Sequence, residues 1–263
     1  MEEGLSQPPL MGVVMNINIK TTIPFGTKLC DIEVPTILRQ RIKTGIGYVD
    51  DALGGKGFTP TMVTLFTGTP GAGKTTMCMI IADSLGESDD TVVLFNTSEE
   101  SLYQTKMVSE RLRLRGNFYT GGMCLVPELL EAADKIRSSN PEKAFFLIVD
   151  SLQTLDDGKY NNGGRTNQTA IRAMEMITTW CKENATNAII IGQVNKGGKM
   201  AGSNKLKHMI DAHMHLSVET RDHELAGCRV LEMLKNRFGG SGHTFFLRLN
   251  ANGFKEIARI SVD

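Results

Sequence analysis

The chain has 263 residues, 41% hydrophobic and 22% charged, a composition typical of a soluble globular protein with one large α/β domain or one domain and an appendage. Its 29 basic and 29 acidic residues balance, which excludes recruitment of nucleic acid by an overall basic field and leaves local basic loops for that purpose. The five cysteines are far apart, the first residues are acidic, and no apolar run approaches about 18 residues, so we expect a cytoplasmic protein without a zinc ribbon, disulfide framework, signal peptide or membrane contact.

The first forty residues differ in pattern from the rest of the chain. Residues 1–11 are polar and contain proline, which is typical of a terminal tail. Residues 13–19 alternate between apolar and polar side chains, which predicts a half-buried strand. An edge strand pairs with its own sheet or with a neighbouring subunit, and both arrangements stay open. We therefore divide the chain into residues 1–40, a tail and strand-containing arm that is a candidate for oligomerisation, and residues 41–263, the core.

The core begins with a short predicted helix, Ile46–Leu53, that Thr44 caps and Gly54-Gly55 ends. It leads to the stretch that organises the chain, Met62–Thr76. Here an apolar, β-branched run stops at GTPGAGKT, a complete match to G-x-x-x-x-G-K-[ST], and a helix-like run, Thr76–Leu85, follows. Strand, loop and helix in this order predict a phosphate-binding loop.

The residue types in this loop suit a nucleoside triphosphate. Glycines let main-chain N–H groups turn toward phosphate oxygens, and the helix N-terminus adds partial positive charge. Lys74 is expected to reach the β- and γ-phosphates, and the Thr75 hydroxyl to bind Mg²⁺. ATP and Mg²⁺ are therefore the expected cofactors. The expected nucleotide contacts are Gly68, Thr69, Pro70, Gly71, Ala72, Gly73, Lys74, Thr75 and Thr76.

Strands and helices alternate after the loop. The predicted strands are Thr91–Asn96, Met123–Val126, Ala144–Val149 and Ala188–Ile191. The predicted helices are Glu99–Leu114, Pro127–Ser139 and Gln168–Lys182. Apolar strands between helices indicate an α/β fold, a mostly parallel twisted sheet with helices on both faces. Three further strands follow without helices and predict a C-terminal antiparallel extension of the same sheet: His213–Val218, Arg229–Leu234 and Thr244–Leu249.

Polar residues at the ends of these strands are the candidate catalytic groups, because ligands of such sheets bind at the carboxyl ends of the strands. Asp150 closes the apolar run AFFLIV and is expected to hold Mg²⁺; a capping aspartate is the alternative. Glu99 and Glu100 follow another buried strand, where a carboxylate can activate the attacking water; two solvated acids at a helix N-terminus are the alternative. Gln193 ends AIIIGQ and is expected to sense the γ-phosphate.

Two glycine-containing loops follow neighbouring strand ends. The segment Asp156–Asn167 carries Lys159 and Arg165. The segment Asn195–Lys207 has no acid and carries Lys196, Lys199, Lys205 and Lys207. Long loops in compact domains are usually functional, and lysines suit a phosphate backbone. We expect both loops to bind single-stranded DNA; ordinary polar loops are the alternative.

With these motifs placed, the chain resembles the RecA superfamily, and most closely the ATPase core of the Sms/RadA recombination proteins. The resemblance extends from about Lys43 to Phe254. KNRFG is its most specific marker. The matching blocks are TGIGYVDDALGG (Thr44–Gly55), the phosphate loop, NTSEES (Asn96–Ser101), VDSLQT (Val149–Thr154) and KNRFG (Lys235–Gly239).

The resemblance implies roles for these residues. Glu99 would be the catalytic carboxylate and Asp150 the Walker B acid, and the two glycine-containing loops would face DNA. Lys235 and Arg237 would act on the nucleotide of a neighbouring subunit. Residues two apart on a strand point the same way, so both cations would project from one side if the strand from Arg229 continues through them.

The expected function is that of a DNA-dependent ATPase that assembles as a ring or filament on single-stranded DNA and promotes recombination and repair by strand exchange or branch migration, in association with the nucleoid. The sequence has neither the four-cysteine zinc finger nor the Lon-like domain typical of relatives, and it has Gln193 where many of them have His. A DnaB-type helicase and a KaiC-like regulatory ATPase are the alternatives. The first normally carries an N-terminal helical domain, and the second a doubled core.

Overall fold

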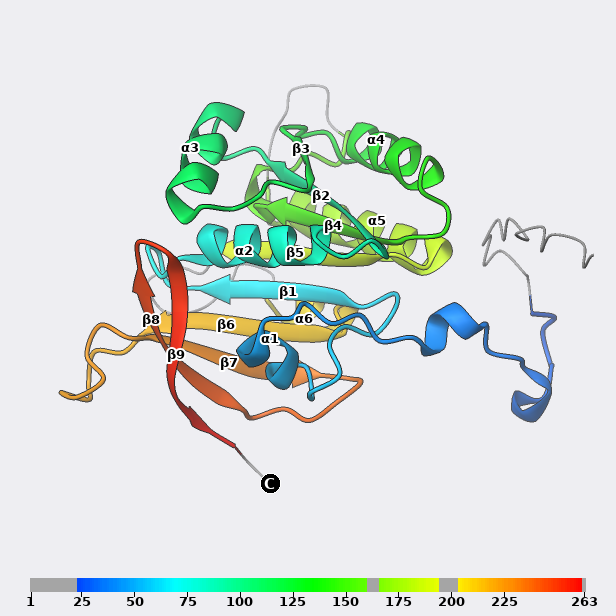
Figure 1. Ribbon diagram of the computed structural model, residues 1–263. Helices are drawn as coiled ribbons and strands as arrows, with labels where there is room; N and C mark the ends of the chain where they lie inside the picture. Colours follow the sequence, from blue (N-terminus) through cyan, green and yellow to red (C-terminus); the bar gives the residue numbers. More distant parts are fainter. Residues whose placement is uncertain (1–22, 160–165, 194–202, 262–263) are drawn as a thin grey trace, which may run out of the picture.

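The computed structural model describes residues 23–159, 166–193 and 203–261. The predicted strand at residues 13–19 lies outside this range. Residues 23–39 extend away from the core and contain two 3-10 turns, η1 (Leu29–Asp31) and η2 (Thr36–Arg39) (Figure 1). The hydrogen bonds described for this segment join its own residues, and Phe25 and Leu29 in it are exposed.

A nine-stranded sheet forms the centre of the described residues, in the order β3-β2-β4-β5-β1-β6-β7-β8-β9 (Figure 1). Its strands are β1 (Val63–Gly68), β2 (Thr91–Thr97), β3 (Tyr119–Gly121), β4 (Ala144–Asp150), β5 (Asn187–Gln193), β6 (Ala212–Val218), β7 (Arg229–Asn236), β8 (Thr244–Asn250) and β9 (Gly253–Ile260). Neighbours from β3 to β6 pair in parallel, and those from β6 to β9 pair antiparallel. The predicted fold, a mostly parallel sheet with a C-terminal antiparallel extension, is confirmed.

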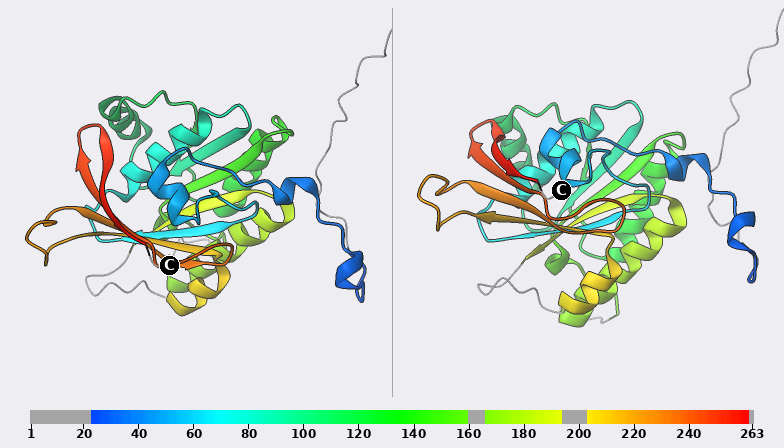
Figure 2. Two further views of the ribbon diagram at one scale, coloured as in Figure 1. Left: turned by 60° about the horizontal axis from the view of Figure 1, so that its bottom comes forward. Right: turned by 90° about the horizontal axis from the view of Figure 1, so that it is seen from below.

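Helices cover both faces of the sheet (Figure 2). They are α1 (Gly47–Ala52), α2 (Lys74–Gly86), α3 (Leu102–Leu112), α4 (Val126–Ser138), α5 (Asn167–Asn184) and α6 (Ser203–Met209). α1 and α2 bury apolar side chains with Phe66 and Phe146 on one face, where α3 packs more loosely through Val108. α4, α5 and α6 bury theirs with Leu65 and Leu147 on the other. Because the parallel strands are covered on both sides, their sequences are continuously apolar.

The strand register brings the predicted site residues to one edge of the sheet. Gly68 at the end of β1 pairs with Gln193 at the end of β5. Thr97 at the end of β2 pairs with Asp150 at the end of β4. The carboxyl ends of four adjacent strands therefore meet beside the turn that follows β1.

The largest differences from the predictions in the first half of the core are the start of α3 and the position of β3. α3 begins at Leu102, because the Ser101 side chain and Gln104 form a capping box there; Glu99 therefore precedes the helix. The predicted strand Met123–Val126 was wrong, since β3 is Tyr119–Gly121. The N–H and C=O of Met123 both bond to the Asn96 side chain, so its main chain is occupied by a side chain and not by a neighbouring strand.

The C-terminal half contains two elements that were not predicted. The end of the segment expected as a loop forms α6, because Leu206 and Ile210, four residues apart, are both fully buried against α5 and its surroundings. β9 pairs along β8, although outward-facing charges obscure its apolar pattern. At the start of the core, α1 begins at Gly47, and Thr44 supports it from outside: its hydroxyl accepts from the N–H of Ile46.

None of the helices in the described parts of the chain is sufficiently long and apolar to span a bilayer.

Candidate nucleotide site

The turn between β1 and α2 is built to accept an anion. Gly71 and Gly73 have φ values of 74° and 102°, a left-handed conformation that favours glycine. No side chain caps α2, so the first N–H groups of the helix are available to a phosphate. Gly68 ends β1, residues 69–73 form the turn, and Lys74, Thr75 and Thr76 open the helix. The predicted nucleotide-contacting residues are therefore brought together.

The ammonium group of Lys74 lies inside this turn. Its Nζ donates to the carbonyls of Gly68 and Thr69 at 3.1 and 3.2 Å. Partial burial lowers the pKa of Lys74, while the nearby carboxylates of Asp150 and Glu99 act in the opposite direction. A partly desolvated cation among main-chain N–H groups is placed to bind phosphate oxygens.

Thr75 and Asp150 form the polar contact that joins α2 to β4. The Thr75 hydroxyl donates to Asp150 Oδ2 at 2.6 Å. Asp150 is 3% exposed, and burial raises its pKa from 3.8 to about 6; the bond from Thr75 opposes this shift and the charge of Glu99 adds to it. A buried acid with a raised pKa is more common at functional sites than elsewhere in a protein.

The donor atoms at this contact suit Mg²⁺. Hydroxyl and carboxylate oxygens are the ligands that this ion prefers, and it usually takes one or two from the protein and others from phosphate and water. In the described residues no three His, Cys, Asp or Glu side chains are grouped to hold a metal. The set Thr75 and Asp150 therefore fits an ion that is shared with a nucleotide.

Glu99 is held from two strand ends. The Ser151 hydroxyl donates to Glu99 Oε1 at 2.5 Å, and the side-chain amide of Gln193 donates to the same oxygen. Glu100, the alternative base, is exposed and has no described hydrogen bond. The structure thus brings Glu99 and Gln193 together beside Asp150, from the ends of β2, β5 and β4.

Lys235 and Arg237 lie apart from the phosphate loop and the carboxylates of Asp150 and Glu99. Lys235 Nζ donates to the carbonyls of Lys207 and Ile210, both at 2.7 Å, at the end of α6. Arg237 Nη1 donates to Asp211 Oδ1 at 3.0 Å, while Oδ2 of this buried aspartate accepts from the N–H of Val63 at 3.1 Å. Both cations therefore point to the same side, at the amino ends of β1 and β6 and away from the phosphate loop of their own chain.

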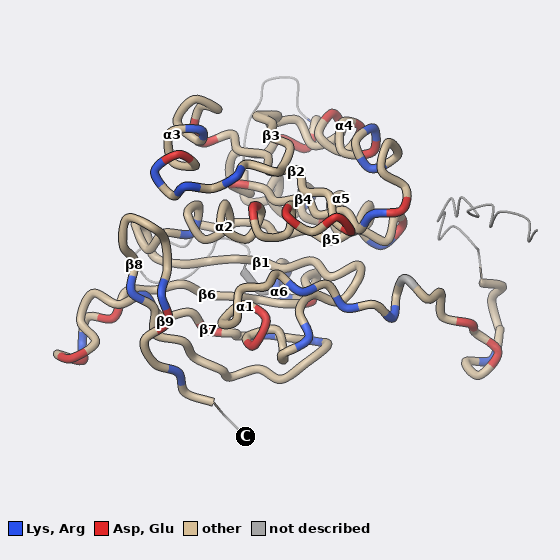
Figure 3. Tube along the Cα trace, in the orientation of Figure 1, with Lys and Arg blue, Asp and Glu red and all other residues tan. Residues whose placement is uncertain are grey.

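The predicted DNA-binding residues are only partly described. Arg165, Lys196 and Lys199 lie outside the described residues. Lys159 is exposed in the loop after β4, and Lys205 and Lys207 are exposed on α6 and not on a loop. Basic and acidic residues are interspersed over the described trace (Figure 3). A contact with nucleic acid must therefore depend on local groups of cations.

Three strands support the phosphate loop in ways that were not predicted. A Cβ on Gly68 would lie 2.1 Å from the carbonyl oxygen of Leu216 on β6, so this position admits only glycine. A Cβ on Gly73 would meet the ring of Phe254 on β9 at 2.9 Å. Arg229 on β7 donates to the carbonyl of Ala72 at 3.3 Å. The antiparallel extension therefore packs directly on the loop. The only sequence signal that could have revealed these close contacts is the presence of glycine at positions 68 and 73.

A hydroxyl–imidazole cluster lies beneath the loop. Thr67 Oγ1 is 2.8 Å from His213 Nε2 and 2.9 Å from His215 Nδ1. Burial, and then the neighbouring His215, lower the pKa of His213 to about 4, and burial also lowers the pKa of His215. Both rings are therefore neutral at pH 7 and fix β1 to β6 one residue before the phosphate loop.

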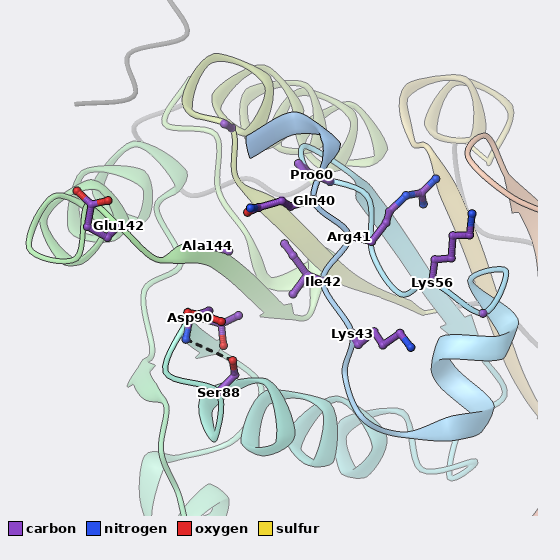
Figure 4. Close-up of a pocket in the computed structure, with 13 residues that line it drawn as sticks. Gln40, Arg41, Ile42, Lys43, Lys56, Pro60, Ser88, Asp90, Glu142 and Ala144 are labelled. Atoms are coloured by element: carbon purple, nitrogen blue, oxygen red, sulfur yellow. Dashed lines mark hydrogen bonds between the residues drawn. The ribbon is translucent and has the colours of Figure 1, made fainter. Parts of the chain in front are cut away.

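A separate cavity of about 740 Å³ lies at the opposite end of the sheet (Figure 4). Pro60, Thr91 and Ala144, which precede or begin β1, β2 and β4, are among its lining residues. It mixes lysines with the acids Asp90 and Glu142 and contains none of the predicted site residues. The predicted nucleotide contacts therefore lie outside this cavity, at the carboxyl ends of the strands.

The sheet order, the phosphate loop after β1 and the acid at the end of β4 define a RecA-like P-loop ATPase. The fold is shared with the KaiC-like protein PH0186 from Pyrococcus horikoshii OT3 (TM-score 0.68, 16% identity, 83% of this chain and 99% of that one). It is also shared with a DnaB-like replicative helicase (TM-score 0.70, 15% identity, 81% and 61%) and with a further solved ATPase domain (TM-score 0.71, 15% identity, 82% and 91%). At these identities the likeness establishes the fold alone.

Within this class the chain is similar to the ATPase core of the DNA repair protein RadA, as its motifs indicated. RadA of Aquifex aeolicus (strain VF5) is 29% identical over 219 residues, which are 83% of this chain and 46% of RadA. RadA of Mycobacterium tuberculosis (strain ATCC 25618 / H37Rv) is 30% identical over 216 residues, 81% of this chain and 43% of RadA. The chain spans about half the length of the curated relatives it matches. No protein-family model matches it.

Proposed function

We propose that the chain is a DNA-dependent ATPase that assembles on single-stranded DNA and acts in recombination and repair, like the RadA proteins to which it is similar. The observation that carries this proposal is the cluster at the strand ends: Lys74 in the phosphate loop, the Thr75–Asp150 pair, and Glu99 beside them. The chemistry of these side chains, and their grouping at adjacent strand ends, support a role in hydrolysis of a γ-phosphate.

The residues divide the work of hydrolysis. Main-chain N–H groups of the loop and Lys74 bind the β- and γ-phosphates and stabilise the charge that develops on them. Thr75 and Asp150 hold Mg²⁺, which when bound neutralises phosphate oxygens. Glu99 accepts the proton of the attacking water. Gln193 senses the γ-phosphate, and its response changes the position of the segment that follows it. Lys235 and Arg237 complete the site of an adjacent subunit in a ring or filament.

Residues 23–39 support assembly as an oligomer. Phe25 and Leu29 in this arm are exposed, and an exposed apolar segment without packing partners is typical of an interface. If the arm and the cations Lys235 and Arg237 both contact neighbouring subunits, the arrangement is head-to-tail, which closes as a ring or continues as a filament. The location proposed for this assembly is the cytoplasm, on nucleoid DNA.

The test is ATP turnover with and without single-stranded DNA at several salt concentrations. A DNA-dependent ATPase is stimulated by DNA, and its affinity for the strand falls with salt because phosphate contacts release counterions. A rate of ATP hydrolysis that is unchanged by any form of DNA would favour the KaiC-like alternative, a regulatory ATPase with a protein partner. Unwinding of a forked duplex without any strand exchange or branch migration would favour the DnaB-type alternative, whose fold this chain shares.

A further inference from the structure

Two glutamine side chains connect the end of β5 to Glu99. Gln153 Oε1 accepts from the main-chain N–H of Gln193 at 3.1 Å, and its Nε2 lies 3.5 Å from the carbonyl of the same residue. The side-chain amide of Gln193 in turn donates to Glu99 Oε1. Gln153 thus holds the main chain of the residue whose side chain contacts the carboxylate.

Gln153 projects from a fixed support. It belongs to the 3-10 turn η3 (Leu152–Thr154), directly after β4. The Thr154 hydroxyl donates to the carbonyl of Ser151 at 2.7 Å and bonds to the Ser98 hydroxyl after β2, while Leu152 is fully buried. Gln193, in contrast, is an exposed residue at the end of its strand. The contact therefore restrains an exposed strand end against a buried and well-bonded turn.

The carboxylate is restrained in consequence. Glu99 Oε1 accepts from both the Ser151 hydroxyl and the Gln193 amide. An oxygen that already accepts two hydrogen bonds is a poor acceptor for the proton of water, and it also fixes the direction of the second oxygen. The contact between Gln193 and Glu99 thus leaves only Oε2 of the carboxylate without a described hydrogen bond, and its direction is tied to the two donors on Oε1.

We propose that Gln153 is a positioning residue that holds Gln193 against Glu99 and so limits ATP turnover in the absence of DNA. This inference rests on the proposed function, in which Glu99 accepts the proton of water. Loss of the Gln153 contact frees the main chain of Gln193, its amide leaves the carboxylate more often, and resting turnover rises. The change acts on the chemical step, because Gln153 makes no described contact with the phosphate loop.

The experiment compares Gln153→Ala with the parent protein in steady-state ATP hydrolysis without DNA. The release of one hydrogen bond of ordinary strength predicts a rise in kcat of about 2- to 10-fold, with KM for ATP unchanged. Gln153→Leu has similar bulk without the polar atoms and carries the same expectation if the Ala variant folds poorly. Gln153→Glu keeps an acceptor for the Gln193 N–H and should stay within about twofold of the parent protein.

Gln168→Ala, an exposed glutamine at the start of α5, is the matched control and should leave turnover unchanged. Thermal unfolding of each variant separates a local effect from a general loss of structure. Folded Ala and Leu variants that hydrolyse ATP no faster than the parent protein would overturn the role of Gln153 and leave the ATPase proposal intact. A parent protein without any turnover would overturn the proposed function, and this inference with it.

Discussion

The Thr75 hydroxyl donates to Asp150 Oδ2 at 2.6 Å and so joins the first turn of α2 to the end of β4, at a carboxyl group whose pKa burial raises to about 6. β5 separates β4 from β1 in the sheet, so this bond ties the helix that follows β1 to a strand two positions away, beside the phosphate loop. The same aspartate is thus a structural link without nucleotide and a metal ligand in the proposed mechanism.

Asp150→Asn should stabilise the nucleotide-free protein in a pH-dependent way. The folded pKa of about 6 exceeds the value of 3.8 in the unfolded chain, so the ionised acid opposes folding above pH 6 and does not below pH 3.8. The gain in unfolding free energy should therefore grow from pH 4 to 6 and then level off, at about 1–3 kcal/mol. Urea unfolding between pH 4 and 8 measures it.

Asp89→Asn, on the surface, is the control for this series and should show no such trend. A gain of the same size at every pH would mean that the charge of Asp150 is not its source. Hydrolysis by Asp150→Asn should nevertheless fall, because the neutral amide is a weaker ligand for Mg²⁺ than the carboxylate.

Lys74→Ala and Glu99→Gln should lose activity for different reasons. Without Lys74 the phosphates lose a charge-assisted partner, so nucleotide binding itself should weaken. Without the Glu99 charge, binding should persist while hydrolysis slows by about 10²-fold or more, the scale of a general base. Titration with a fluorescent ATP analogue and single-turnover hydrolysis separate these effects. Normal hydrolysis by Glu99→Gln would transfer the role to Glu100.

Lys196→Ala/Lys199→Ala should weaken DNA binding at low salt while leaving DNA-free turnover unchanged. Each lysine that neutralises a phosphate contributes about 0.7 to the slope of log affinity against log salt on single strands. The double variant should therefore flatten that slope by up to about 1.4. Lys106→Ala, on the exposed face of α3, is the matched control. Identical slopes for the double variant and the parent protein would exclude these two lysines from the DNA contact.

Lys235→Ala/Arg237→Ala should regain activity when mixed with Glu99→Gln, although each protein is inactive alone. Both cations point away from their own phosphate loop, so a junction that pairs an intact Glu99 with a neighbour's intact cations restores one complete site. A cation supplied in trans contributes about 10³-fold or more in well-studied cases. ATP turnover across mixing ratios measures the recovery, and Arg248→Ala on β8 is the control. Co-assembled mixtures that stay inactive would contradict action in trans.

Continuous apolar runs and the phosphate-loop pattern predicted the parallel half of the fold, because buried strands and glycine turns leave strong local signals. The ends of β2, β4 and β5 also followed from sequence, and with them Asp150, Glu99 and Gln193. The strand predicted at Met123 failed because Asn96, 27 residues away in sequence, takes its main-chain groups. Such a contact exists only once the chain has folded.

The residues that position the site residues could not be identified from the sequence. Ser151 and Gln153 stand in the block VDSLQT, but their partners, Glu99 and Gln193, come from other strands. Phe254 packs on Gly73 from β9, where the adjacent charged residues Lys255 and Glu256 interrupt any alternating apolar pattern. The chemistry-bearing residues are local features of the sequence, whereas the residues that orient them are defined by tertiary contacts.

Asp211 makes the proposed use of Arg237 by a neighbouring subunit energetically conditional. This aspartate is 4% exposed, and its two oxygens hold Arg237 and the first N–H of β1. An arginine that swings out to another subunit's nucleotide leaves behind a buried carboxylate with one donor fewer, at a cost of about 1–3 kcal/mol. Only a well-formed junction between subunits recovers that free energy. Loose or wrongly docked neighbours would therefore leave the arginine on Asp211, and hydrolysis would be confined to correctly assembled protein.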